Sequence, residues 1–444
     1  MTKPISRVKN RLLQCVQGVS ETAWLFSSVP GKDFTRNRKL SFETMVKTLL
    51  CMEGGSLTNE LMKRFGCRAD VVSAAAFVQQ RGKILPEAFE TIFRLFAEET
   101  DGRRLYNGYR LFAVDGSDLQ IPTNPQDEDS YFPGSNGQHP YNLLHLNAMY
   151  DLLQRTYVDA IVQKRHCYDE CRSLTEMVDR SSIKQPTIII ADRAYESYNV
   201  LAHIQEKGWY FLIRVKDAGR ASGFVTGLDL PCEDTFDFPV HLSLTRKQTN
   251  AVKQLCKQRN NYRYIPHSNV FDYLPPKSKK DLPAVFYQLP FRVVRFPITE
   301  NSFETVVTNL PVDSFPPYEL KNLYAMRWGI ETSFRELKYT VGLLHFHAKK
   351  TEHILQEIFA RLTMYNFSEL ITSHVVIQKH NRKNAYRANF SVAVHICRQF
   401  FLGNVSPPDV EALIARHVSP IRPGRNRPRI LSAKTAVSFT YRVA

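Results

Sequence analysis

Apolar side chains from Phe42 to Phe96 recur at spacings of three and four residues, which is the period of an amphipathic helix. We therefore expect a helical region here. Its middle stretch, residues 70–85, begins with a capping-type Asp70 and has polar residues beyond a face of small side chains, namely Gln79, Gln80, Arg81 and Lys83. This pattern fits a DNA-recognition helix, and it fits equally well an ordinary bundle helix with a solvated side.

After Gly108 the period changes to that of strands. Three strands in succession predict a meander, and they are followed by a helix, a short apolar strand, a second helix and a last strand. The expected ranges are 109–116, 145–153, 155–163, 169–180, 187–191, 195–207 and 209–216. Strands that alternate with helices in this way indicate a mixed α/β layer.

The helical signal nearly disappears between residues 217 and 299, where short β-rich runs alternate with Pro and Gly. We interpret this stretch as a β-rich insertion. Helical periodicity returns at Pro317 and continues to about Phe401, and the chain beyond Pro407 reads as an irregular basic tail.

The segment 320–344 carries two side-chain faces when its residues are placed at 100° intervals. One face is a core stripe formed by Leu323, Met326, Ile330, Phe334, Leu337 and Val341. The neighbouring face holds one carboxylate among cations and a phenol: Tyr324, Arg327, Glu331, Arg335 and Lys338. A solvated face with an Arg327–Glu331 pair would look the same, so this stripe alone does not identify a site.

Two aspartates end predicted strands, Asp115 after LFAV and Asp192 after TIIIA. Each alone fits a turn or a helix cap. Together with Glu331 they indicate three carboxylates at one rim of a sheet, where like charges require compensation, usually by divalent cations. Oxygen-only ligands favour Mg²⁺ or Mn²⁺, and two such ions support phosphodiester chemistry, with the cations of the stripe holding phosphates.

Composition narrows the class of protein. The 444 residues predict two to four domains at roughly 150 residues each, and 43% hydrophobic residues exclude wholesale disorder. The net charge of +16 and the pI near 9.4 favour a polyanionic partner.

No apolar run approaches the ~20 residues of a membrane span, so we expect a cytoplasmic protein without membrane contact. The eight scattered cysteines predict reduced thiols and no zinc site.

A basic run lies inside the insertion, where residues 245–280 hold nine Lys and Arg against one acid, Asp272, with Tyr and Phe interleaved. This pattern predicts a surface that follows a DNA strand, in which we expect Lys277, Lys279 and Lys280 to bind DNA. The alternative is a solvated loop whose charge is incidental.

In these residues the sequence resembles the DDE transposases of bacterial insertion sequences, specifically the subgroup with a Y-x2-R-x3-E-x6-K signature. Tyr324, Arg327, Glu331 and Lys338 match the signature at every spacing. The motifs DGS at 115–117, DRAY at 192–195 and RPGR near the C-terminus are also similar to that family.

The resemblance implies an α/β fold: an RNase-H-like mixed sheet flanked by helices, interrupted by a β-rich insertion, with an N-terminal helical domain and a helical C-terminal region. The expected division is a DNA-binding domain at 1–105, a catalytic domain at 106–216 and 304–350, the insertion at 217–303 and a basic-tailed helical region at 351–444. Asp115, Asp192 and Glu331 would be catalytic ligands of two Mg²⁺ or Mn²⁺ ions, and Tyr324, Arg327 and Lys338 would contact DNA. Arg335 lies outside the signature, and the helical stripe alone makes it a candidate for DNA binding.

The implied activity is cleavage at the ends of a DNA element followed by joining to target DNA, performed by a homodimer that is associated with the nucleoid when bound to DNA. Two alternatives stay open. One is a nuclease that hydrolyses DNA without strand transfer. The other is a catalytically silent, transposase-derived protein that binds a specific DNA sequence.

Overall fold

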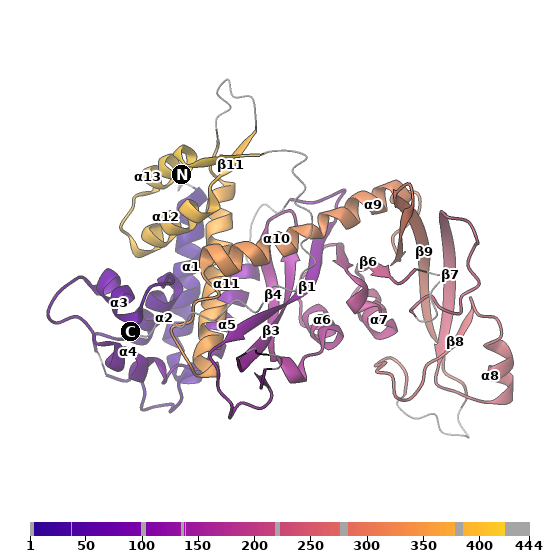
Figure 1. The fold of residues 1–444 in the computed structure, drawn as a ribbon, viewed down its shortest axis with the longest axis horizontal. Coiled ribbons are helices and arrows are strands. Elements are labelled where there is room, and N and C mark those ends of the chain that lie inside the picture. Colours follow the sequence, from indigo (N-terminus) through magenta and orange to yellow (C-terminus); the bar gives the residue numbers. More distant parts are fainter. Residues whose placement is uncertain are drawn as a thin grey trace.

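The computed structural model describes residues 4–421 except 37, 99–103, 135, 136, 138, 218–222, 276–282 and 378–384. Lys277, Lys279 and Lys280, and the arginines of the RPGR tail, lie outside the described residues. Figure 1 shows three parts side by side: a helical body that contains both ends of the described chain, a central sheet with its own helices, and the insertion at the far end.

The central sheet forms because β1 (Arg110–Ile121), β3 (Tyr141–Asp151) and β4 (Thr156–Lys164) pair antiparallel as a meander. The apolar strands β5 (Thr187–Ala191) and β6 (Tyr210–Val215) then add parallel on the other edge of β1. The order β4-β3-β1-β5-β6, with only β3 running against the others, is the RNase-H-like arrangement. The predicted fold class is confirmed.

The insertion extends this sheet. The strands β10 (Ser302–Thr308), β9 (Tyr287–Thr299), β7 (Phe236–Thr245) and β8 (Tyr262–Tyr264) continue in that order beyond β6, and the short β2 (Tyr131–Phe132) pairs with β3. In the part of the chain that the structure describes, these strands form one ten-stranded sheet.

Helices cover both faces of the sheet. On one face, α6 (Glu170–Asp179) and α7 (Tyr198–Glu206) bury Val114, Ile189 and Phe211. On the other face, the helical body packs against Ala113, Leu146 and Ala160. The body combines helices from both ends of the chain: α1 (Pro4–Glu21), α2 (Phe42–Cys51), α3 (Leu57–Phe65), α4 (Ala74–Arg81), α5 (Glu87–Glu98), α11 (Thr351–Ser373), α12 (Phe390–Leu402) and α13 (Pro407–Arg416). Its N-terminal and C-terminal helices therefore share one core.

Shorter elements complete the chain. They are the 3-10 turns η1 (Ala23–Phe26), η2 (Arg165–Cys167) and η3 (Arg193–Tyr195), the helix α8 (Asn250–Leu255) in the insertion, and the hairpin of β11 (Tyr386–Ala388) with β12 (Val418–Pro420). The prediction of an irregular tail beyond Pro407 is wrong for the first part of that tail, because α13 begins at Pro407. A proline in the first helical turn leaves no hydrogen bond unmade.

The stretch predicted as a possible recognition helix is shorter than expected. Ser73, rather than Asp70, caps α4 by accepting a hydrogen bond from the Ala76 amide. Arg81 points into the protein, where its guanidinium bonds to Gln356 Oε1 at 2.7 Å and Glu357 Oε1 at 2.8 Å. Arg81 is therefore a structural residue, and the predicted polar face loses one of its cations.

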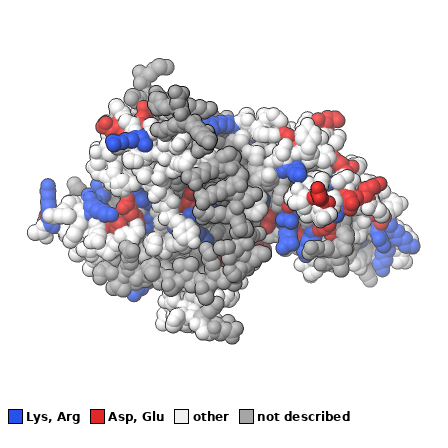
Figure 2. All heavy atoms as spheres, turned by 45° about the horizontal axis from the view of Figure 1, so that its top comes forward, with Lys and Arg blue, Asp and Glu red and all other residues white. Residues whose placement is uncertain are grey.

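The basic run of the insertion also divides between the interior and the surface. Arg246 and Lys247 are buried, and Arg246 donates to the carbonyls of Pro266 and Asn269. Lys253 and Lys257 on and after α8 are exposed. On the face drawn in Figure 2, basic and acidic side chains are interleaved, and some of the basic ones gather at the end of the molecule that the insertion occupies.

No helix within the described ranges is both long and apolar enough to cross a bilayer.

Glu357 on α11 gives the first prediction. Burial alone would raise its pKa, but Arg81, His347 and Arg361 outweigh burial and hold the pKa of this carboxyl far below its usual value. Glu357→Gln removes the charge that these cations need, so we expect unfolding to become easier by about 3 kcal/mol at pH 7 in a urea titration.

The depressed pKa means that the carboxylate stabilises the fold above the unfolded-state pKa and loses this effect as the pH falls. The difference between Glu357→Gln and wild type should therefore shrink below about pH 4. Lys39→Gln, which breaks the exposed Lys39–Asp70 pair, is the control and should leave stability unchanged. Equal losses in the two variants would contradict a special role for the buried pair.

Candidate active site

Asp115 and Asp192 lie at the same level on neighbouring strands. The parallel strands β1 and β5 pair through Ala113 and Ile190, and each aspartate lies two residues beyond that pair. Asp192 directly follows the end of β5, as predicted. Asp115 does not end its strand, which corrects the prediction: β5 stops pairing with β1 at Ala113, whereas β3 continues to pair with it as far as Ile121.

The third acid comes from a helix that crosses this edge of the sheet. The predicted single helix 320–344 is divided into α9 (Pro317–Met326), α10 (Trp328–Glu336) and the π-helical turn η4 (Leu337–Val341). Its core stripe is buried as expected except at Met326, which is only partly buried, and Glu331 lies in the first turn of α10. Figure 1 shows α9 and α10 running along the sheet from the insertion to the helical body.

Arg327, at the joint between α9 and α10, links two of the acids. Its Nη2 donates to Glu331 Oε1 at 2.8 Å, and its Nη1 lies 3.4 Å from Asp115 Oδ2. The residue is only 6% exposed, so its positive charge is concentrated on these partners. Ala113 packs in the same core cluster as Ile330 and Phe334 of α10, and Asp115, two residues along the strand, points to the same face.

The carboxylate of Asp115 is affected by its surroundings and by the two other acids. Burial raises the pKa of Asp115 to about 6; Arg327 and the Gly116 amide act in the opposite direction, while Asp192 and Glu331 raise it further. Asp192 Oδ1 also accepts a hydrogen bond of 2.8 Å from the Ala194 amide and so caps η3. The set has the oxygen donors that a hard divalent cation prefers. Among the described residues, however, no three His, Cys, Asp or Glu side chains are grouped closely enough to form a metal site.

The remaining predicted site residues differ in their surroundings. Tyr324 is 4% exposed, its hydroxyl has no hydrogen-bond partner among the described residues, and burial raises its pKa to about 12. Lys338 Nζ donates to the backbone carbonyl of Asp118 on β1 at 2.8 Å, and burial lowers its pKa. Arg335 is exposed and lines a cavity that contains none of the three acids, so the structure does not bring it to the acidic cluster.

Sequence reasoning missed a histidine that lies between two acids beside Asp115. His145 on β3 contacts Asp118 Oδ1 through Nδ1 at 2.6 Å and Glu170 Oε1 through Nε2 at 3.0 Å. Burial lowers the pKa of His145, but the two carboxylates more than compensate and raise it above its usual value. No sequence signal marks this group, because Asp118 and His145 meet only through the pairing of β1 with β3.

Tyr195 is a second neighbour of the acids, and in the sequence it stands out only as the last residue of the DRAY motif. It is 1% exposed, and within the described part of the chain its hydroxyl has no hydrogen-bond partner. Burial raises its pKa well above the usual value, and the negative charges of Glu170, Asp115 and Asp192 raise it further. The tyrosine of DRAY is therefore close to the acids rather than on the surface.

Gly116 gives the second prediction. A Cβ atom at this position would collide with the His145 ring and with the Glu170 carboxylate. We expect Gly116→Ala to destabilise the fold by about 1–3 kcal/mol, because the histidine and its partners would have to shift. Thermal unfolding measures the effect. Gly18→Ala in α1 is the matched control, since a Cβ there meets nothing within 4 Å. A Gly116→Ala protein as stable as the control would show that the packing around His145 is loose.

Comparison with known proteins identifies the family. No curated protein matches this chain. Among solved structures, a piggyBac transposase in a synaptic complex with hairpin DNA is similar with a TM-score of 0.43 and 10% identity, over 96% of this chain and 87% of that one. The model of the transposase DDE domain family matches residues 106–367, which is more than half of the chain and includes Asp115, Asp192 and Glu331. The chain therefore belongs to the transposase DDE domain family.

Proposed function

We propose that this protein is a transposase that hydrolyses the phosphodiester bond at each end of a DNA element and uses the freed 3′-hydroxyls to attack target DNA. The observation that carries the proposal is the arrangement of the acids. Asp115 on β1 and Asp192 just beyond the end of the adjacent parallel strand β5 lie level, and Glu331 is joined to Asp115 through Arg327. Carboxylates collected in this way are suited to phosphoryl transfer.

We infer that Asp115, Asp192 and Glu331 hold two divalent cations, Mg²⁺ or Mn²⁺. Such ions, when bound, make water or a hydroxyl a stronger nucleophile and stabilise the leaving oxygen. The chain supplies the positioning. Arg327 keeps Glu331 facing Asp115, and the hydrogen bond from Lys338 to the Asp118 carbonyl ties η4 to β1. Tyr324, Arg327 and Lys338 would then contact the phosphates beside the bond that is cut.

DNA is the proposed partner, bound by a homodimer of this chain at two element ends. We propose that the helices of residues 1–105 and the insertion bind DNA. Residues 106–216 and 304–350 would form the catalytic domain. In the insertion, the exposed Lys253 and Lys257 are available for phosphates, whereas the buried Arg246 is not.

The third prediction tests the acids one at a time. Asp115→Asn, Asp192→Asn and Glu331→Gln should each reduce cleavage by at least about a hundredfold, because each removes a carboxylate that would hold the divalent cations. Binding to the element end should stay near wild type, since affinity comes mainly from phosphate contacts. Linear DNA that carries the element ends, incubated with and without Mg²⁺ and resolved on a denaturing gel, measures both cleaved and joined products.

Asp313→Asn is the matched control for this series, because Asp313 is an exposed carboxylate outside the acidic cluster. It should cut like wild type. A variant of Asp115, Asp192 or Glu331 that cut normally would remove that residue from the site. Cleavage without joined products would favour the nuclease, and binding of one DNA end with no cleavage under Mg²⁺ or Mn²⁺ would favour the silent DNA-binding protein.

The fourth prediction separates Lys338 from Glu331. Seven residues along a helix correspond to about 10 Å, so the two side chains serve different parts of the substrate. Lys338→Ala should lower single-turnover cleavage about tenfold at saturating Mg²⁺, which is the cost of one charged hydrogen bond, and should leave metal affinity unchanged. Lys338→Arg keeps the charge and should recover part of the rate. Loss of metal binding in Lys338→Ala would contradict the proposed role.

A further inference from the structure

A second polar site lies one helical turn beyond the acids. A cavity of about 760 Å³ opens between the β3–β4 turn, the end of α10, the end of α11 and the β11–β12 hairpin. Its size falls in the range of ligand sites. Arg335 lines it and follows Glu331 by four residues on α10, which is about 6 Å along the helix axis. The acidic cluster and the cavity are therefore neighbours on one helix.

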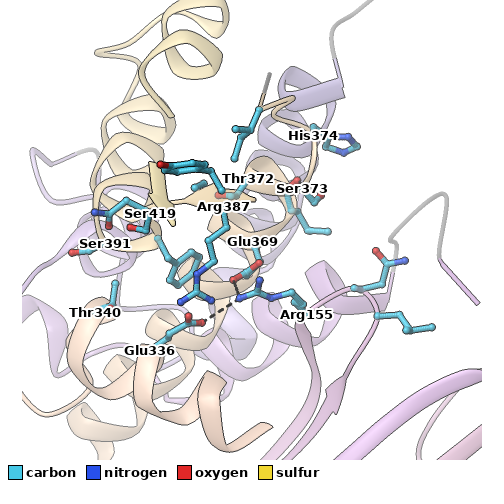
Figure 3. Close-up of a pocket in the computed structure, with 18 of the residues that line it drawn as sticks. Arg155, Glu336, Thr340, Glu369, Thr372, Ser373, His374, Arg387, Ser391 and Ser419 are labelled. Atoms are coloured by element: carbon cyan, nitrogen blue, oxygen red, sulfur yellow. Dashed lines mark hydrogen bonds and ion pairs between the residues drawn. The ribbon is translucent and has the colours of Figure 1, made fainter. Parts of the chain in front are cut away.

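The wall of the cavity is rich in guanidinium groups. Arg104, Arg155, Arg335 and Arg387 line it, against two acids, Glu336 and Glu369. Arg155 pairs with both acids, at 3.5 Å and 3.1 Å. The side chains of Arg335 and Arg387 make no ion pair or hydrogen bond with any residue within the described ranges. Figure 3 shows Arg387 and Arg155 converging beside Glu336. Like charges that converge in this way leave room for an anion.

The acids of the cavity do not cancel this charge. Glu369 is almost fully buried, and burial raises its pKa to about 8, although Arg155 and Arg387 act in the opposite direction. Glu336 also accepts a hydrogen bond from the Tyr365 hydroxyl. Four guanidinium groups line the cavity against two carboxylates, so its lining carries more positive than negative charge.

Two further features indicate that the cavity is a binding site for a polar ligand. The buried polar atoms Gln154 Nε2 and Thr372 Oγ1 line the cavity and have no hydrogen-bond partner among the residues that the structure describes, which is unusual for buried donors. Arg155 has a left-handed backbone with φ of 59°, which is uncommon for a residue other than glycine. The turn that presents Arg155 packs on α10, because Leu152 touches the position where Gly329 would carry a Cβ.

We propose that this cavity binds phosphate groups of the DNA strand that passes through the acidic site. The inference rests on the proposed function. Guanidinium forks match phosphate oxygens, and the free donors of Gln154 and Thr372 complete such a site. A free nucleotide has the same phosphate chemistry, and the experiment distinguishes the two sources.

The test is the salt dependence of binding to a short DNA duplex. Arg335→Gln/Arg387→Gln removes two cations that have no ion-pair partner in the described structure, so the fold should persist, as thermal unfolding will show. We expect weaker binding, and a slope of log affinity against log salt that falls by about 0.9 for each phosphate that the variant no longer neutralises. Lys184→Gln, an exposed lysine on the loop before β5, is the control and should keep the wild-type slope.

A second measurement assigns the source of the phosphate. Thermal unfolding is followed with millimolar deoxyadenosine monophosphate and with inorganic phosphate. Protection of the wild type but not of the double variant, without any change in the DNA slope, assigns the site to a free nucleotide. An unchanged slope together with no such protection overturns the proposal. Because the wild type still binds DNA in that case, this failure is distinct from failure of the proposed function, which the cleavage experiment decides.

Discussion

Carboxylates that converge at one edge of a sheet repel one another, and the active-site region of this protein depends on how that repulsion is compensated. Arg327 compensates two of the three charges, with a hydrogen bond to Glu331 and a contact to Asp115. The guanidinium is buried, whereas the side chains of Asp115 and Glu331 are partly exposed, so water screens the cation less than its partners. Arg327 also lies where α9 gives way to α10. One residue thus sets both the charge balance of the site and the approach of the helix to the sheet.

The helix that carries Glu331 is held in turn by parts of the chain that are far apart in sequence. Ile330 and Phe334 pack in the core that the N-terminal helices share with α11 and with one face of the sheet. Leu320 and Leu323 of α9 pack against Ile190 of β5 and Phe296 of β9 in a separate cluster. The position of Glu331 relative to Asp115 therefore depends on the helical body at one end and on the insertion at the other.

Charge in this protein is distributed by folding rather than by sequence order. The basic run of the insertion loses Arg246 to carbonyls of its own loop, and Arg81 is used to neutralise Glu357 inside the helical body. Conversely, Arg155 and Arg387 are separated by more than 200 residues and meet at one cavity. A count of cations along the chain is therefore a poor guide to where a polyanion is bound.

Local patterns were sufficient for the elements whose burial is uniform along their length. The run TIIIA predicts β5 and the position of Asp192, and the apolar stripe of 320–344 predicts which side of α10 is buried, because period and side-chain direction are coupled. The start of α13 could also have been read from Ser406 and the prolines after it. The hydrophobic period does not determine which strands pair or in which register. Pairing between strands that are distant in sequence decided these features. Asp115 lies within its strand because β3 is longer than β5, and His145 reaches Asp118 because β3 pairs with β1 in one register. The alternation of side chains along a strand predicts which residues share a face. Only the packing of other segments on that face decides which charges meet there.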